Sequence, residues 1–351
     1  MFGFAKKRSY LGVDFGSAGL KAVELAVDKG KPRLVTYGFT ELPVDVVRNV
    51  SVEARDLAVN SLKALVQQAH VTTTKAVAAL PNFAVFTQIM DLPVMSDKDL
   101  AAAVRWEAKK IVPWPLEEMI LDWKKLDIPA APKDATSGSA TMKVLLIAAL
   151  KNVVARYMEI FKLANIELLS LETEAFSVAR ALAVTDVPTM LIVDIGAFTT
   201  DLAVVERNIP LINRTLDIGG NTLTKAIAHS LNINEQRAEQ FKRDFGLAVE
   251  AGGSIPKTIE AAFSPVINEV KYLFDLYQGQ SRTPIQKVVL TGGSAYLPHL
   301  PDFLQTLLKV PVILGDPWDR VVYPVELKPA LDEVGPMLVV AIGLALREIV
   351  S

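Results

Sequence analysis

The stretch that decides the fold is LGVDFGSAGLK at residues 11–21, which recurs in altered form as LIVDIGAFTTD at 191–201. Each copy runs through apolar residues, an Asp, one apolar residue and a Gly into a tight turn. An apolar–polar alternation resumes after each turn, as KAVELAV at 21–27 and DLAVVER at 201–207. Because alternation with a period of two is typical of strands, each copy predicts a strand, a turn and a second strand.

The turns have the chemistry of an anion-binding site. Gly16 and Gly19 can adopt backbone angles closed to other residues, so the main chain can approach a ligand closely. Successive amide hydrogens in such a turn form a nest for an anion. Ser17 adds a hydroxyl, and Lys21 on the second strand supplies a positive charge for phosphate. One such hairpin is common in ordinary proteins, but two copies predict two similar halves that face one anionic ligand across a cleft.

Bulk composition narrows the class of protein. The 351 residues allow two or three domains, and the formal net charge of −2 predicts no broad basic face for nucleic acid. The absence of Cys excludes disulfides, thiolate catalysis and cysteine metal sites, and the three His show no ligand spacing. Apolar runs such as VLLIAAL at 144–150 are too short to span a membrane, and the start, MFGFAKKRSY, is not a secretion signal. We therefore expect a cytoplasmic α/β protein that reaches a membrane only through a partner.

The first half has an informative order of elements. A third strand is expected at 34–41, a helix at 51–70 with Ser51 as its N-cap, and a buried strand at 75–81. This order, β-β-β-α-β, is neither a Rossmann unit nor a P-loop start. The glycine motifs of those two folds, GxGxxG and GxxxxGK[ST], are also missing from the chain.

Residues 84–165 are expected to form a separate small module. Strand patterns alternate there with two helices, the first of which begins with a capping box at Ser96 and Asp99, and a polar loop is expected at 132–140. Three of the four tryptophans fall in this module. We expect Trp106, Trp114 and Trp123 to fill its small core, and the alternative is that they bind a partner.

The second half repeats the pattern and adds two glycine pairs. Gly219 and Gly220 precede a helix whose start can contact phosphate or ribose. In the sequence QKVVLTGGSAYLP, a buried strand meets a bend at Gly292 and Gly293, and a new helix is expected from Ser294. The helix at 234–245 carries Glu239 and Lys242 on one face, for which a surface ion pair is the default interpretation.

Two further helices are rich in small residues. ETEAFSVARAL at 172–182 and GPMLVVAIGLALR at 335–347 could cross closely and join the halves, or could be two ordinary buried helices. The pattern does not distinguish these alternatives.

Five motifs now stand in one order: hairpin, small-residue helix, hairpin, TGG bend and final small-residue helix. This order resembles the superfamily of actin, sugar kinases and heat-shock ATPases, whose motifs are called phosphate-1, connect-1, phosphate-2, adenosine and connect-2. Within it the chain is most similar to the PilM family of type IV pilus assembly proteins, and next to FtsA. The segments that carry this likeness are YLGVDFGSAGLKAVEL at 10–25, EAKKIVPWPLEEMILDW at 107–123 and VDIGAFTTDLAVV at 193–205.

The resemblance implies an actin-like ATPase fold, with two duplicated βββαβα halves, an FtsA-type inserted subdomain, and ATP with Mg²⁺ in the cleft between the halves. The first-half core would comprise 8–83, 166–190 and 336–351, the inserted subdomain 84–165, the second-half core 191–221 and 280–335, and the second-half outer subdomain 222–279.

The resemblance also implies a set of site residues. The metal would be held by Asp14 and Asp194, and Glu174, with Glu172 in reserve, would orient the attacking water. The expected nucleotide-binding residues are Gly16, Ser17, Ala18, Gly19, Lys21, Gly196, Ala197, Phe198, Thr199, Thr200, Gly219, Gly220, Asn221, Glu239, Lys242, Gly292, Gly293, Ser294 and Tyr296.

The expected role is a scaffold with at most slow ATP hydrolysis. The resemblance implies that it docks the N-terminal cytoplasmic tail of PilN, an inner-membrane pilus protein, in a groove between the first-half core and the inserted subdomain. The sequence ends at ALREIVS without the linker and amphipathic helix of FtsA, so recruitment to the inner membrane through PilN is expected. A polymerising FtsA-like protein and a small-molecule kinase are the alternatives.

Overall fold

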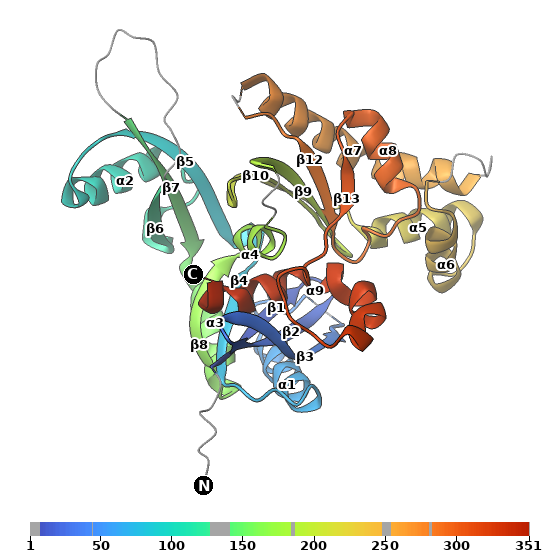
Figure 1. The fold of residues 1–351 in the computed structure, drawn as a ribbon, viewed down its shortest axis with the longest axis horizontal. Coiled ribbons are helices and arrows are strands. Elements are labelled where there is room, and N and C mark those ends of the chain that lie inside the picture. The colour runs from blue at the N-terminus through green and yellow to red at the C-terminus, as the bar shows by residue number, and fades with distance from the viewer. Residues whose placement is uncertain are drawn as a thin grey trace. The chain divides into compact units, whose positions relative to one another are not determined.

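The computed structural model describes residues 8–43, 45–126, 141–183, 187–247, 254–280 and 283–350. The chain divides into two compact units, a larger one of residues 1–79 and 160–351 and a smaller one of residues 80–159 (Figure 1). Each unit is described by itself. The loop predicted at 132–140 lies outside the described residues.

The first sheet of the larger unit has the strand order β3-β2-β1-β4-β8. Its strands are β1 (Ser9–Gly16), β2 (Gly19–Asp28), β3 (Lys31–Glu41), β4 (Lys75–Leu80) and β8 (Glu167–Thr173). β1 pairs antiparallel with β2, with Asp14 opposite Lys21 and Gly16 opposite Gly19. On its other side, β1 pairs parallel with β4. The first hairpin is therefore confirmed.

The second sheet has the equivalent order β11-β10-β9-β12-β13. Its strands are β9 (Thr189–Ile195), β10 (Thr200–Glu206), β11 (Ile209–Leu216), β12 (Lys287–Thr291) and β13 (Val312–Leu314). β9 pairs antiparallel with β10 and parallel with β12, as β1 does with β2 and β4. The predicted duplication of the two halves is confirmed.

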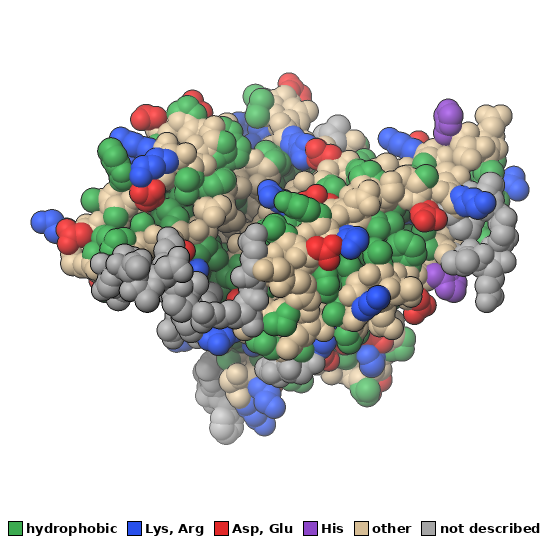
Figure 2. Space-filling view, turned by 90° about the horizontal axis from the view of Figure 1, so that it is seen from above, with side chains coloured by type: hydrophobic (Ala, Val, Ile, Leu, Met, Phe, Trp, Pro, Cys, Tyr) green, Lys and Arg blue, Asp and Glu red, His purple; other side chains and the backbone are tan. Residues whose placement is uncertain are grey.

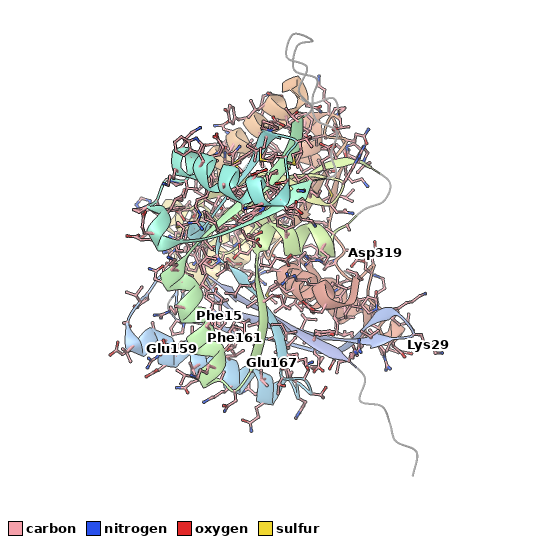
Figure 3. The ribbon with its side chains drawn as sticks, turned by 90° about the vertical axis from the view of Figure 1, so that its left-hand side faces the viewer. Phe15, Lys29, Glu159, Phe161, Glu167 and Asp319 are labelled. Carbon is pink, nitrogen blue, oxygen red and sulfur yellow. The ribbon has the colours of Figure 1, made fainter. Side chains whose placement is uncertain are left out.

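Helices cover the two sheets, and several begin where the sequence predicts. Ser51 caps α1 through a hydrogen bond that its Oγ accepts from the amide of Ala54, at 3.1 Å. The helices of the larger unit are α1 (Val52–Gln68), α4 (Glu174–Ala181), α5 (Gly220–Leu231), α6 (Glu235–Phe245), α7 (Ser254–Gln280), α8 (Leu300–Leu308) and α9 (Lys328–Val350). A further helix, α3 (Lys151–Leu163), continues from the smaller unit into the larger one. Phe161 near its end packs edge-on against Phe15 of β1, with the ring centroids 6.2 Å apart (Figure 3).

The two helices rich in small residues, α4 and α9, form a packed pair. A Cβ placed on Gly343 of α9 would lie 1.9 Å from the carbonyl oxygen of Ser177 in α4. A Cβ on Gly12 of β1 would lie equally close, at 1.9 Å, to the carbonyl oxygen of Ala341. Only glycine permits these approaches, so the interpretation as a close crossing is confirmed. None of the helices in the described ranges is both long and apolar enough to span a membrane.

Two predicted helix starts are wrong. Residues 167–173 continue as strand β8 beside β4, so the helix expected from Glu172 begins at Glu174. The helix expected from Ser294 is instead a series of turns, in which the amide of Leu297 donates to the carbonyl of Ser294 at 3.1 Å. Pro298 cannot continue such a ladder because it has no amide hydrogen, and His299 has a positive φ of 64°. Helix α8 therefore begins only at Leu300.

The smaller unit has a three-stranded antiparallel sheet in the order β5-β7-β6. Its strands are β5 (Val85–Pro93), β6 (Met119–Leu126) and β7 (Thr141–Leu150), and helix α2 (Asp97–Ile111) packs on one face. Ser96 caps α2, and its Oγ lies 2.7 Å from Asp99 Oδ2, which confirms the capping box. Trp114 packs against the core, but Trp106 is 64% exposed and Trp123 is 36% exposed. The expectation that all three tryptophans fill the core is therefore wrong for Trp106, which faces away from the sheet on α2, and for Trp123, which is exposed on the edge strand β6.

Candidate functional site

The turn between β1 and β2 is built around a partly buried ion pair. Lys21 Nζ lies 2.8 Å from Asp14 Oδ2, and the Asp14 side chain is only 4% exposed. A Cβ on Gly16 would lie 2.8 Å from Lys21 Nζ, so glycine makes room for the lysine. Ser17 and Ala18 form the turn itself, and Ala18 accepts a hydrogen bond from the amide of Leu42 at 3.2 Å. The ion pair holds a positive charge directly beside the turn.

The turn between β9 and β10 stands at the equivalent place in the second sheet and has a different charge. The amide of Gly196 donates to the carbonyl of Thr199 at 2.8 Å and closes a turn formed by Ala197 and Phe198. Asp194 stands opposite Asp201, at the positions that Asp14 and Lys21 occupy in the first hairpin. The lysine of one hairpin is thus replaced by a carboxylate in the other.

The start of α5 is attached to this second turn. The amides of Gly220 and Asn221 donate to the carbonyls of Gly196 and Ala197, at 3.0 and 2.8 Å. A Cβ on Gly219 would lie 2.6 Å from the Gly196 carbonyl oxygen. The two amides are therefore used within the protein, and they fix the turn against the helix.

The TGG bend after β12 packs against the end of β9. Gly292 has φ 88°, and a Cβ there would lie 2.3 Å from Asp194 Oδ1. The amide of Ser294 donates to the carbonyl of Ile195 at 3.0 Å. Tyr296 is turned toward α9, where its hydroxyl donates to the carbonyl of Asp332 at 2.5 Å, and it is 48% exposed. The bend thus lies directly beside Asp194.

Lys242 joins α6 to the start of α5. Its Nζ donates to the Gly220 carbonyl and to Thr224 Oγ1, both at 3.1 Å, and lies 2.7 Å from Glu239 Oε2. Partial burial alone would raise the pKa of Glu239, but hydrogen bonds from Lys242, Thr224 and Arg243 lower it to about 2. Since Lys242 is buried, this is not the surface ion pair expected by default.

Carboxylates gather where the two hairpins meet α4. Burial, with repulsion from Asp201 and Asp14, raises the pKa of Asp194 to about 7, although Lys21 opposes the shift. Burial and the same neighbours raise the pKa of Glu174, the first residue of α4, well above its ordinary range. The pKa of Lys21 is also raised: burial alone would lower it, but the surrounding carboxylates raise it. The site therefore has an excess of negative charge that one lysine does not balance.

Two acidic residues differ from the sequence expectation. Glu172 does not face the cluster, because Arg180 holds both of its oxygens, at 2.5 and 2.8 Å. Asp201 belongs to the cluster and was not among the predicted residues. A signal was present, because Asp201 and Lys21 end the two copies of the repeat at matching positions with opposite charges.

The structure places the other predicted residues in two groups. Those around the two turns and the carboxylate cluster are Asp14, Gly16, Ser17, Ala18, Gly19, Lys21, Glu174, Asp194, Gly196, Ala197, Phe198, Thr199 and Thr200. Those on α5, α6 and the TGG bend are Gly219, Gly220, Asn221, Glu239, Lys242, Gly292, Gly293, Ser294 and Tyr296. The contacts of Gly219, Gly220 and Gly292 join the second group to the phosphate-2 turn of the first.

The sequence matches the family described as type IV pilus assembly protein PilM over residues 12–349. The chain belongs to the PilM family. A solved PilM–PilN type IV pilus biogenesis complex is similar to this PilM-family chain, with a TM-score of 0.81 and 28% identity. That match covers 97% of this chain and 98% of the other.

More distant relatives show the wider fold of the PilM family. FtsA of Neisseria meningitidis serogroup B is 26% identical over 148 residues, which is 36% of this chain and 36% of FtsA. MreB of Pasteurella multocida is 24% identical over 179 residues, 41% of this chain and 51% of MreB. Each match thus spans about half of the relative or less. The structure of MreB5 of Spiroplasma citri bound to ADP has a TM-score of 0.55 at 15% identity, covering 98% of this chain and 97% of that one. The predicted actin-like ATPase fold is therefore confirmed.

Proposed function

We propose that this PilM-family protein is a cytoplasmic ATP-binding scaffold of type IV pilus assembly, which docks the N-terminal tail of an inner-membrane PilN protein. The observation that carries the proposal is the convergence of two hairpin turns, the start of α5 and the TGG bend around Asp194. This arrangement suits a ligand with several phosphates on one side and a nucleoside on the other. The role in pilus assembly is supported by membership of the PilM family.

The side chains at the turns fit a nucleotide that carries Mg²⁺. No group of three or more His, Cys, Asp or Glu in the described ranges could hold a metal ion by itself. Mg²⁺ usually keeps several waters and takes one or two carboxylates together with phosphate oxygens. We assign Asp14 and Asp194 to this role, and the turns at 16–19 and 196–199 to the phosphates. When bound, the ion would neutralise charge on the phosphates and on the carboxylate cluster.

Glu174 explains why the scaffold would hydrolyse ATP slowly. A residue that orients attacking water must accept a hydrogen bond or a proton from it. Burial and the neighbouring carboxylates raise the pKa of Glu174 well above its ordinary range in the free protein, which widens the pH range over which its carboxyl holds a proton and cannot accept one from water. Lys21 would contribute to ATP binding, because its positive charge lies beside the first turn. We therefore propose that ATP binding, rather than turnover, serves the scaffold.

We propose that PilN recruits the chain to the inner membrane. The similar solved structure is a PilM–PilN complex, which supports a PilN tail as the ligand. We further propose that residues 80–159 are the inserted subdomain and take part in docking that tail. In this scheme ATP stabilises the closed arrangement of the two halves, and the closed form favours the peptide.

The test is a titration of the full chain with a peptide from the N-terminus of PilN, with and without Mg-ATP. Micromolar or tighter binding that strengthens with Mg-ATP is the expected result. Asp194→Ala should weaken ATP binding and abolish that strengthening. If the peptide binds in neither nucleotide state, the assignment to pilus assembly is refuted. If Asp194→Ala leaves both affinities unchanged, the coupling between the two sites is refuted.

A further inference from the structure

One helix of the smaller unit has an outer face that the proposed function does not use. Helix α2 packs on the sheet through Leu100, Val104 and Ala108, which are buried. The opposite side of α2 carries exposed residues at helical spacing. We name this side the basic–tryptophan face, and its charged and aromatic residues are Lys98, Asp99, Arg105, Trp106, Lys109 and Lys110.

Three of the four cations of this face are available for a ligand, and the fourth, Lys110, is paired with Glu107. No ion pair joins Lys98, Arg105 or Lys109 to any residue in the described part of the chain. The acidic residues of α2 are already engaged. Asp97 pairs with Lys125 of β6, and Glu107 pairs with Lys110 at 2.7 Å. Asp99 accepts from the capping hydroxyl of Ser96 at 2.7 Å. The hydroxyl of Ser96 leaves the charge of Asp99 in place, so the face presents four cations, one carboxylate and a net positive charge to solvent.

Aromatic side chains accompany the cations. Trp106 is 64% exposed, and the ammonium of Lys110 lies 5.6 Å from its ring centroid. Trp123 of β6 is opposite Leu146 of β7, whose side chain belongs to the core beneath α2. Trp123 is thus on the same side of the sheet as α2, on an edge strand, and is also partly exposed. Lysine and arginine side chains lie next to hydrophobic ones in the left-hand part of Figure 2, where the smaller unit is seen.

We propose that the basic–tryptophan face binds an anionic phospholipid surface directly. Lys and Arg near such a surface are attracted by its negative potential, and Trp favours the interface between headgroups and acyl chains. From Lys98 to Lys110 the face extends about 18 Å along the outer side of one helix, a strip that can lie flat on a membrane. A flat strip with exposed rings suits a lipid surface better than an acidic peptide, which helical grooves or sheet edges usually hold.

This binding would be weak, reversible and sensitive to salt. One short basic strip that contains Trp106, with Trp123 on the neighbouring strand, supplies a single membrane signal, and stable anchoring usually takes two. The proposed PilN tail would be the second. The lipid contact does not depend on PilN or on nucleotide, so it can be tested without either.

The test is co-sedimentation of the full chain with vesicles of phosphatidylcholine alone or with about 30% phosphatidylglycerol, at low and high salt. We expect binding only to the anionic vesicles, lost at about 0.5 M salt. The variant Arg105→Glu/Lys109→Glu should bind at least about 30-fold more weakly, since each cation contributes about fivefold. Its matched control, Lys225→Glu/Lys257→Glu, makes the same change in net charge at exposed positions of α5 and α7 and should bind as the wild type does.

Trp106 provides a second readout. Its emission should shift to the blue with anionic vesicles, and Trp106→Ala should remove most of that shift. Absence of vesicle binding, or equal binding by the two charge variants, overturns the proposal. A third arm uses polyglutamate: if only that polymer binds, and only Arg105→Glu/Lys109→Glu abolishes it, the face recognises an acidic protein and the lipid assignment is wrong.

Discussion

Replacing Asp194 with Asn should stabilise the free protein while weakening its binding of Mg-ATP. Asp194 stands among Asp14, Asp201 and Glu174, and its pKa is raised to about 7 by burial and by repulsion. Asn keeps the shape and removes the charge, so the repulsion is relieved. The same change removes an oxygen donor that we assign to the hydrated metal. Opposite effects on stability and affinity are characteristic of a residue kept for its ligand.

The size of the stabilisation follows from the pKa. An ordinary Asp titrates near 4, so a native pKa of about 7 is a shift of about 3 units, or at most about 4 kcal/mol. Coupling to the neighbouring carboxylates reduces this, and we expect about 1–3 kcal/mol. Between about pH 4 and pH 7 the native Asp194 holds a proton that the unfolded chain has released. The wild type therefore loses stability as the pH rises from about 4 to about 7. The stability advantage of Asp194→Asn grows over the same range and is constant above about pH 7.

The assay is denaturant unfolding of the wild type and of Asp194→Asn, without ligand, at several values between pH 4 and pH 8. Asp319→Asn is the control, because Asp319 is exposed and is not among the carboxylates that shift the pKa of Asp194 (Figure 3). Titration with Mg-ATP should show at least tenfold weaker binding by Asp194→Asn. The reasoning is refuted if Asp194→Asn is no more stable than the wild type at pH 8, or if its advantage does not shrink at pH 4.

Two further changes test the packing and the α5–α6 connection. In thermal unfolding, Gly343→Ala should destabilise the fold by about 3 kcal/mol or more, because the new Cβ would lie 1.9 Å from the Ser177 carbonyl oxygen. The control is Gly279→Ala, whose Cβ would have no atom within 4 Å, and it should be neutral or slightly stabilising. Glu239→Gln should cost about 1 kcal/mol at pH 7, because the lowered pKa of Glu239 reflects stabilisation by Lys242. That cost is fully present above about pH 4.5 and disappears as the pH falls toward 2. Denaturation curves of the wild type and Glu239→Gln should therefore show a smaller difference in free energy of unfolding at pH 3 than at pH 7. An equal difference at the two pH values would contradict the ion-pair account.

Much of the fold could be predicted because its determinants are local. The period-two alternation around Asp14 and Asp194 specifies two hairpins, and the repeat itself indicates two similar sheets. Caps such as Ser51 are read directly from residue type, because a side-chain oxygen must satisfy a free amide at the helix start. The small residues of α4 and α9 suggested a close crossing, although only the approach of Gly343 to Ser177 shows that the two helices touch.

The wrong predictions have different physical causes. Glu172 has the spacing of a helical residue, but pairing of β8 beside β4 extends the strand past it, and Arg180 then takes up its carboxylate. Ser294 follows a strand as a helix start would, yet Pro298 interrupts the ladder four residues later. Tryptophan is a residue type common in cores, but Trp106 lies on the side of α2 that faces away from the sheet. Only the first outcome depends on contacts between segments, whereas Pro298 and the helical phase of Trp106 are features of the local sequence.

The position of Asp201 is visible in the sequence repeat, but its effect on Asp194 is visible only in the structure. It closes the second copy of the repeat where Lys21 closes the first, so the two hairpins carry opposite charges at matching positions. In the first hairpin the lysine neutralises Asp14, and in the second Asp201 repels Asp194 and raises its pKa. Charge on one side of the site is therefore balanced within the protein, while charge on the other side requires a proton or a cation from solution. In the proposed function, Mg²⁺ bound with the phosphates of a nucleotide would supply that cation beside Asp194 and would leave the lysine of the first hairpin to face the phosphates.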